Sequence, residues 1–195
     1  LMVASSDGHE SCVLVLVEAG ADKEAENNGG CTALMYASER GHDSIVQVLA
    51  EAGADMSGLT SVEFLKAAKS GDESRVRALL ESGVAIEVKG GSGLTGLMNA
   101  SMLGHESCAR FLLEAGADVH AKSTHGSTAL TLASERGHEA CVQALLAADA
   151  DVHFSDGDGD TSLASASYGG HDSIVRLLLE AGADKEVKNN AGNTA

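Results

Sequence analysis

Short apolar stripes recur along the chain at helical spacing. In the segment 128–138, Leu130 and Ala133 lie on one side of a short helix, and Gly137 ends that helix. A second stripe follows at the same spacing and is formed by Cys141, Val142, Leu145 and Leu146. Two helices of two or three turns cannot bury such faces by themselves. The pattern therefore predicts a helix pair that needs similar pairs stacked on either side.

The same pattern is repeated through the chain in a 33-residue register. A Gly-His pair precedes the second helix of most copies, at Gly8-His9, Gly41-His42, Gly104-His105, Gly137-His138 and Gly170-His171. Gly71-Asp72 takes its place once. A fixed period in this range predicts a solenoid of stacked repeats rather than one globular domain.

The ends of the helices carry matching signals. Gly-Ala-Asp follows the second helix at Gly20, Gly53, Gly116 and Gly182, with Asp149-Ala150-Asp151 as a variant. Thr-x-Leu opens the first helix at Thr32, Thr95, Thr128 and Thr161. A Thr hydroxyl can accept a hydrogen bond from an unpaired N–H at a helix start. Gly readily adopts the left-handed conformation just past a helix end.

These motifs resemble those of the ankyrin repeat family over essentially the whole chain. The family's Asp-x-x-Gly-x-Thr opening is complete at Asp156, Gly159 and Thr161, and Asn replaces the Asp at Asn27 and Asn189. The family usually has Pro after the Thr, whereas this chain has none, which should cost some rigidity without changing the fold. The resemblance implies an all-α repeat solenoid of stacked helix-turn-helix repeats with β-hairpin or finger loops.

The register divides residues 1–195 into repeats. A partial repeat covers 1–25, repeats follow at 26–57, 58–89, 90–122, 123–154 and 155–188, and another starts at 189–195. Both ends therefore fall inside a repeat. Since a terminal repeat needs a polar outer face to stay soluble, this predicts that the chain is part of a longer array.

The repeat 58–89 departs from the others. It is short between Gly53 and Val62, so its finger is predicted to shrink to residues 54–61 and its first helix to begin at Val62. Arg75 stands where other repeats have Cys or Ile, and burying an unpaired guanidinium is costly. We therefore expect Arg75 to point outward or to pair with an acid from the preceding repeat. These features resemble an N-terminal capping repeat and predict a seam at 57/58, either within a continuous stack or between two arrays, 1–57 and 58–195.

Charge and cysteine usage narrow the function classes. The net charge of −16 argues against nucleic acid or an anionic membrane as a direct partner. Cys12, Cys108 and Cys141 share a repeat position with Ile45 and Ile174, which predicts small core residues. Stacked helices lie roughly 10 Å apart, beyond the ~7 Å limit for a disulfide. A cytoplasmic or other reducing intracellular compartment is expected.

Three patterns could indicate chemistry, and each has a simpler structural interpretation. The segment 156–160 alternates Asp and Gly like the start of a calcium loop, but Thr161 and Ser167 stand where an EF-hand needs Gly and Glu. A finger turn is therefore favoured over weak calcium binding. The Gly-His residues occur once per repeat, too far apart to share a zinc ion. Ser, His and Asp recur in register without converging, so we expect no cofactor, no metal and no enzymatic activity.

The resemblance implies a non-catalytic scaffold that binds a partner protein on its concave and finger surface, as solenoids do. Two alternatives remain: a permanent structural subunit of a larger assembly, and the recognition arm of a multidomain enzyme. Contact is expected at or beside positions that vary between repeats, next to an alanine that never changes. Apolar residues among them favour contact over an unconstrained surface. The predicted contact residues are Cys31, Tyr36, Lys66, Leu94, Asn99, Met102, Ser127, Leu132, Asp160, Ser165 and Tyr168.

Overall fold

The computed structural model describes residues 1–195 apart from the side chain of Ser57. Within this description the chain folds into successive helix pairs. The first helices of the pairs are α1 (Met2–Ser6), α3 (Ala33–Arg40), α5 (Ser57–Ser70), α7 (Gly96–Met102), α9 (Ala129–Arg136) and α11 (Ser162–Gly169). The second helices are α2 (Glu10–Glu18), α4 (Asp43–Glu51), α6 (Glu73–Glu81), α8 (Glu106–Glu114), α10 (Glu139–Ala147) and α12 (Asp172–Glu180).

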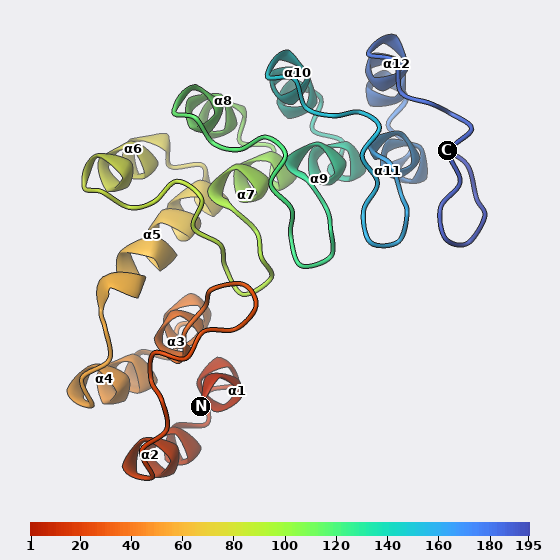
Figure 1. Ribbon diagram of the computed structural model, residues 1–195. Helices are drawn as coiled ribbons and strands as arrows, with labels where there is room; N and C mark the ends of the chain where they lie inside the picture. Colours follow the sequence, from red (N-terminus) through yellow and green to blue (C-terminus); the bar gives the residue numbers. More distant parts are fainter.

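The pairs stack side by side into the predicted all-α repeat solenoid (Figure 1). The first helices form an inner row, the second helices form an outer row, and long loops project from the inner row. We call these loops fingers; they cover residues 19–32, 82–95, 115–128, 148–161 and 181–195. The molecule exposes 9382 Å², more than the roughly 8600 Å² expected of a compact protein of this mass. The excess area reflects the elongated shape.

The predicted helix caps are present. The hydroxyl of Thr128 accepts a hydrogen bond from the backbone N–H of Thr131 at 3.3 Å. The same bond forms at Thr32, Thr95 and Thr161. Gly137, with φ at 79°, ends α9 in the left-handed conformation. Because these residues fix where a short helix starts and stops, the repeats that carry them present their apolar faces in the same way.

Four of the five histidines that precede a second helix connect their repeat to the one before. Nε2 of His138 donates a hydrogen bond to the carbonyl oxygen of Met102 at 3.0 Å. Its ring lies so close to Gly104 that a Cβ there would be 2.5 Å from Nδ1, and Gly104 also has a φ of 75°. Any other residue at Gly104 would therefore be both strained and in contact with the ring. Equivalent bonds join His42 to Ser6, His105 to Lys69 and His171 to Glu135.

Neighbouring fingers are joined at their tips by backbone hydrogen bonds. The N–H groups of Thr124, Gly157 and Asn190 donate to the carbonyl oxygens of Ser92, His125 and Asp158, at 3.2, 2.9 and 3.0 Å. Within each finger the arms are irregular backbone with short turns, and the arm that enters the first helix ends in an extended Thr. In the described part of the chain, β pairing is limited to one antiparallel bridge between Ser155 and Thr161.

The apolar core is divided near α5. One cluster runs from Phe64 in α5 to Ala183 beyond α12 and includes the fully buried Leu145. A second cluster lies among α1 to α4 around Leu34 and Leu49. A small group of Cys31, Met35 and Val62 lies between them, with Tyr36 packed against it.

The cysteines behave as predicted with one exception. Cys108 and Cys141 are buried, and all four cysteines are free thiols. Cys12 is exposed, so the prediction that it is a core residue was wrong. In other repeats the residue at this position faces the second helix of the preceding repeat. The helix that carries Cys12, α2, stands at the end of the row of second helices (Figure 1).

The stack opens between α4 and α6. The other second helices pack on their neighbours, whereas α4 and α6 diverge (Figure 1). The connection 52–56 is too short for a finger. Asp72 takes the histidine position, and its carboxylate caps α6 by accepting from the N–H of Arg75. Two of the regular contacts between repeats, the finger and the histidine bond, are therefore replaced at this step.

One detail of the short repeat differs from the sequence-based prediction, and another agrees with it. The finger expected at 54–61 is wrong, because α5 begins at Ser57 and takes residues 57–61 into its first turns. Val62 occupies the repeat position of the capping Thr residues, such as Thr95, and it has no hydroxyl to cap a helix that starts after it. Arg75 points outward as expected, with a side chain 54% exposed, but its partner is Glu63 of the same repeat rather than an acid of the preceding one.

Inner-row contacts hold the two sides of the opening together. Helices α3 and α5 pack on each other, and the small group around Met35 and Val62 is buried between them. Nζ of Lys66 in α5 donates a hydrogen bond to the carbonyl oxygen of Ser38 in α3 at 2.8 Å. Hence the inner row remains stacked between α3 and α5, whereas the outer row separates between α4 and α6.

We expect residues 58–195 to fold without residues 1–57. The deletion exposes Val62 and Leu59, which pack against residues of the deleted part, but it leaves the main cluster from Phe64 onwards intact. Circular dichroism should show a cooperative thermal transition for 58–195. Deleting residues 1–95 instead cuts through that cluster, between Phe64 and Leu97, and should lower the transition temperature markedly. Loss of the cooperative transition in 58–195 would contradict the division of the core.

Asp149→Gly should stabilise the protein. Asp149 occupies the position of the helix-ending glycines and has a φ of 61°, which costs a residue other than glycine about 1 kcal/mol. Glycine adopts this conformation freely but loses more chain entropy on folding, so we expect a net gain of about 0.5 kcal/mol. Chemical denaturation measures it, with Asp151→Gly as the control that should not stabilise. A loss of stability in Asp149→Gly would contradict the strain.

Candidate functional site

Each first helix presents two side chains on the finger side, one turn apart. In α9 these are Leu132 and Glu135, and the intervening Ala133 is fully buried. The alanine is the same in every repeat: Ala4, Ala37, Ala67, Ala100, Ala133 and Ala166. The flanking inner-face pairs all differ: Val3 and Ser6, Tyr36 and Glu39, Lys66 and Lys69, Asn99 and Met102, Leu132 and Glu135, and Ser165 and Tyr168.

The predicted contact residues differ in accessibility. Tyr168 is 92% exposed and Lys66 is exposed. Those of intermediate burial are Tyr36, Leu94, Met102, Ser127, Leu132, Asp160 and Ser165. Cys31 and Asn99 are buried, contrary to the expectation that these positions face solvent, although both line the hollow described below. Cys31 packs with Met35, and Nδ2 of Asn99 donates to the carbonyl oxygen of Thr95 at 2.9 Å.

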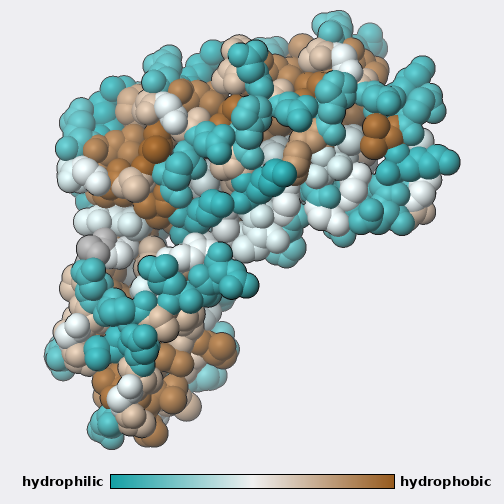
Figure 2. Space-filling model, in the orientation of Figure 1, coloured by the Kyte–Doolittle hydropathy of each residue, from teal (hydrophilic) through white to brown (hydrophobic). Residues whose placement is uncertain are grey.

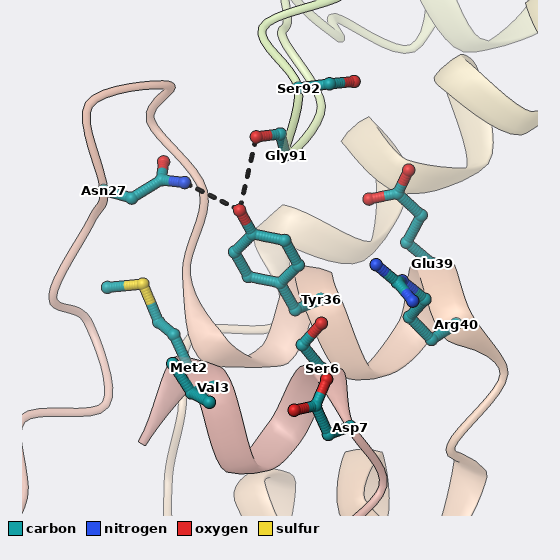
Figure 3. Close-up of a pocket in the computed structure, with 10 residues that line it drawn as sticks. All are labelled: Met2, Val3, Ser6, Asp7, Asn27, Tyr36, Glu39, Arg40, Gly91 and Ser92. Carbon is teal, nitrogen blue, oxygen red and sulfur yellow. Dashed lines mark hydrogen bonds between the residues drawn. The ribbon is translucent and has the colours of Figure 1, made fainter.

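Tyr36 connects two fingers. Its hydroxyl accepts a hydrogen bond from Nδ2 of Asn27 at 2.8 Å and donates one to the carbonyl oxygen of Gly91 at 3.3 Å (Figure 3). Asn27 and Gly91 belong to fingers 19–32 and 82–95, which are neighbours because no finger lies between them. Burial is the main cause that raises the pKa of the Tyr36 phenol, so the hydroxyl keeps the proton it donates.

An open groove of about 530 Å³ lies beside Tyr36. Figure 3 shows Met2, Val3, Ser6 and Asp7 of α1 along one side, and Glu39 and Arg40 at the end of α3 along another. Gly91 and Ser92 of finger 82–95 border it from above. The groove continues the inner face towards the N-terminal helices, where Figure 2 shows apolar side chains at the surface. Val3 is 75% exposed there.

A smaller hollow of about 120 Å³ lies among α3, α5, α7 and finger 82–95. Its apolar lining is Met35, Val62, Leu65, Leu94 and Met102, and its charged lining is Glu39, Lys66 and Lys69. Cys31, Gly90, Ser92 and Asn99 complete it. The hollow thus brings together five of the predicted contact residues, although they come from three repeats. The others lie elsewhere: Tyr36 in the groove, and Ser127, Leu132, Asp160, Ser165 and Tyr168 on later repeats.

Sequence reasoning missed part of this lining. Met35 and Leu65 share a repeat position with Met98, which is buried, so nothing in the repeat pattern marked them as accessible. Lys69 lies one turn beyond Lys66 on the same face of α5. The signal that could have located the hollow is the shortened segment after Gly53, since a missing finger uncovers the helices beneath it.

Basic side chains gather around the hollow and the groove. Lys66 and Lys69 line the hollow and Arg40 lines the groove, in a chain whose net charge is −16. The ion pairs of the described residues lie elsewhere: Arg75–Glu63, Arg77–Glu73, Arg110–Glu106 and Arg136–Glu135. Lys69 has no acidic partner within the part of the chain that the structure describes, so its ammonium group is available to a ligand.

The reactive side chains have structural roles. Burial is the main cause that raises the pKa of the Cys31, Cys108 and Cys141 thiols to about 11, so they are not thiolates near neutral pH. Oδ1 of Asp156 accepts hydrogen bonds from the N–H groups of Asp158 and Asp160, which forms a finger turn. Among the described residues, no group of three His, Cys, Asp or Glu could hold a metal. In the same residues, no helix is long and apolar enough to cross a membrane.

Comparison with known families agrees with this geometry. The family model for ankyrin repeats in three copies matches residues 1–58, 64–156 and 108–189. The chain therefore belongs to the ankyrin repeat family, whose members are generally protein–protein interaction modules and typically non-catalytic. Residues 59–63 fall outside the matches, and they lie in the part of α5 that replaces a finger. No curated protein matches the chain.

Tyr36→Phe should weaken the connection between the two fingers. The change removes the hydrogen bonds to Asn27 and Gly91 and keeps the ring, so we expect a loss of about 0.5–1.5 kcal/mol in the free energy of unfolding. Chemical denaturation measures it. Tyr168→Phe is the matched control, since Tyr168 is 92% exposed and should lose nothing measurable. Equal stabilities of the two variants would show that the Tyr36 hydroxyl does not stabilise the fold.

Proposed function

We propose that the chain is a non-catalytic module that binds a partner protein across the inner face of the first helices and the fingers. The observation that carries this proposal is the contrast within each first helix. The alanine, which is buried in every repeat but the first, never changes, while the two inner-face residues beside it differ in every repeat. The fold constrains the alanine and leaves the two residues beside it free to match a partner.

The character of the variable residues supports contact with protein. Tyr168 is 92% exposed, and Leu132 and Met102 are accessible apolar residues on the same row. Solvent alone would favour charged side chains at such positions, and Tyr is enriched among residues that dominate binding energy. Consecutive repeats therefore offer an apolar path along the inner face.

The electrostatics and the chemistry limit the class of partner. A net charge of −16 repels nucleic acid and anionic lipid surfaces. The raised thiol pKa values leave no reactive cysteine among the three buried ones. A protein partner with polar and apolar contact residues is not repelled in this way, and its binding needs no reactive thiol.

Site-directed photo-crosslinking tests the proposed surface. Benzoylphenylalanine placed at Tyr168 or Ser165 on the inner face should crosslink to the same partner in cells. The same group at Gln143, which is exposed on α10 of the outer row, is the control and should not. Partner capture at Gln143 alone would place the interface on the outer face. A partner that crosslinks and also copurifies in fixed stoichiometry through high salt would indicate a permanent subunit.

Tyr168→Ala should weaken binding to the crosslinked partner without affecting the fold. We expect a loss of at least about 1 kcal/mol in binding free energy, as for a truncated hot-spot residue. Because the side chain is almost fully exposed, the free energy of unfolding should change by less than about 0.5 kcal/mol. Calorimetry and chemical denaturation measure the two values. Gln143→Ala is the control for both, and unchanged affinity in Tyr168→Ala would exclude this residue from the interface.

A further inference from the structure

The hollow beside α5 exists because one arm of a finger is missing. In other repeats an extended arm enters the first helix, and its last residue before the capping Thr lies on the inner face, as Leu94 does before Thr95. The equivalent residue of the short repeat is Ser61. It belongs to α5 and lines a gap on the other side, between the fingers, with Gly29 and Val88. No residue of the short repeat's own arm therefore covers the inner face at this step.

The size of the hollow selects one kind of side chain. Its volume is about 120 Å³, whereas an apolar cavity of about 150 Å³ is large enough to bind benzene. A leucine, isoleucine or methionine side chain therefore fits better than an aromatic ring. The apolar lining, which includes Met35, Leu65 and Leu94, suits the same aliphatic groups.

The charged side chains around the hollow indicate which group of a ligand should lie next to the aliphatic side chain. Three charged side chains line it: Lys66, Lys69 and Glu39. Nζ of Lys66 is partly committed to the carbonyl oxygen of Ser38. Lys69 is exposed and has no acidic partner among the described residues, so a carboxylate beside it gains an ion pair.

We propose that the hollow binds an extended segment of a partner protein that carries an aliphatic side chain next to an acidic one. The segment takes the course of the missing finger arm, with the aliphatic side chain in the hollow and the carboxylate at Lys69. This inference rests on the proposed function as a protein-binding module and specifies one part of its surface. The remaining inner-face residues, such as Leu132 and Tyr168, would contact other parts of the same partner.

A minimal probe combines the two required groups in one molecule. The probe 4-methylpentanoate carries an isobutyl group and a carboxylate, and 4-methylpentanamide carries the same isobutyl group without the charge. Methyl NMR spectra of residues 1–195 follow the titration through Val62, Leu65 and Leu94. We expect saturable shifts at these methyls with millimolar dissociation constants. The amide should bind about two- to fivefold more weakly, the range of an exposed ion pair.

A variant of Lys69 separates the charge from the cavity. Lys69→Gln should weaken binding of 4-methylpentanoate about two- to fivefold and leave binding of the amide unchanged. Lys185→Gln is the matched control, because Lys185 is exposed and lies beyond α12, and it should affect neither probe. Leu65→Phe should fill the hollow and abolish both titrations. If Leu65→Phe does not fold, the Lys69 comparison still decides the proposal.

Peptides test whether the ligand is a protein segment. Two blocked hexapeptides carry Leu-Asp or Asp-Leu between flanking Gly and Ser residues. At least one should displace 4-methylpentanoate and bind at least about fivefold more tightly, and replacing its Leu by Ala should abolish displacement. If the acid binds but neither peptide does, the site takes small acids and the proposal is overturned.

Other outcomes overturn the proposal directly. They are no saturable shift at the three methyls, equal binding of acid and amide, and shifts of the same size at Leu177 and Leu179 in α12. Crosslinking from Tyr168 is independent of the hollow. A captured partner together with a silent hollow would therefore refute only this inference, whereas no crosslinked partner would refute the proposed function.

Discussion

The structure depends on the contact between each repeat and the next. A pair of helices this short cannot bury its apolar face alone, so the core forms only where pairs stack. Each regular step combines buried residues such as Cys141, a bond like that from His138 to Met102, and a backbone bond between finger tips. Between the repeats of α4 and α6, none of these three contacts takes its regular form. The stack changes direction there, and the surface uncovered by the change carries the hollow and the groove.

The parts of the fold that could be predicted are those set by local chemistry. Thr128 caps a helix and Gly137 ends one because of their own side chains and backbone freedom, so the helix pairs, the caps and the family followed directly from the residues. Burial of Cys12 and exposure of Asn99 were predicted wrongly because both depend on neighbours. Cys12 needs a preceding second helix to cover it, and Asn99 is buried beside the finger that enters α7.

The short repeat shows the same limit. The missing residues were visible in the sequence, and they indicated a weakened step. Whether residues 57–61 would form a small finger or extend a helix depended on Val62, which cannot cap a helix start, and on the room beside Met35, where Gly58 approaches the Met35 side chain. Because Gly58 and Met35 are distant in sequence, the shortened segment could indicate the place of the hollow but not the residues that line it. Tyr36 illustrates the same limit, since its hydroxyl connects two fingers of its own chain, which the sequence did not indicate.

Pulsed electron paramagnetic resonance tests the open step most directly. In one variant, nitroxide labels are attached through Gln47→Cys in α4 and Arg77→Cys in α6. In a second variant, they are attached through Arg110→Cys in α8 and Gln143→Cys in α10. Both variants also carry Cys12→Ser, because Cys12 is exposed. All four sites occupy the same repeat position, one repeat apart within each pair. The account predicts a longer mean distance for the α4–α6 pair than for the α8–α10 pair. Equal distance distributions would contradict it, because they would mean that the stack passes through the short repeat unchanged.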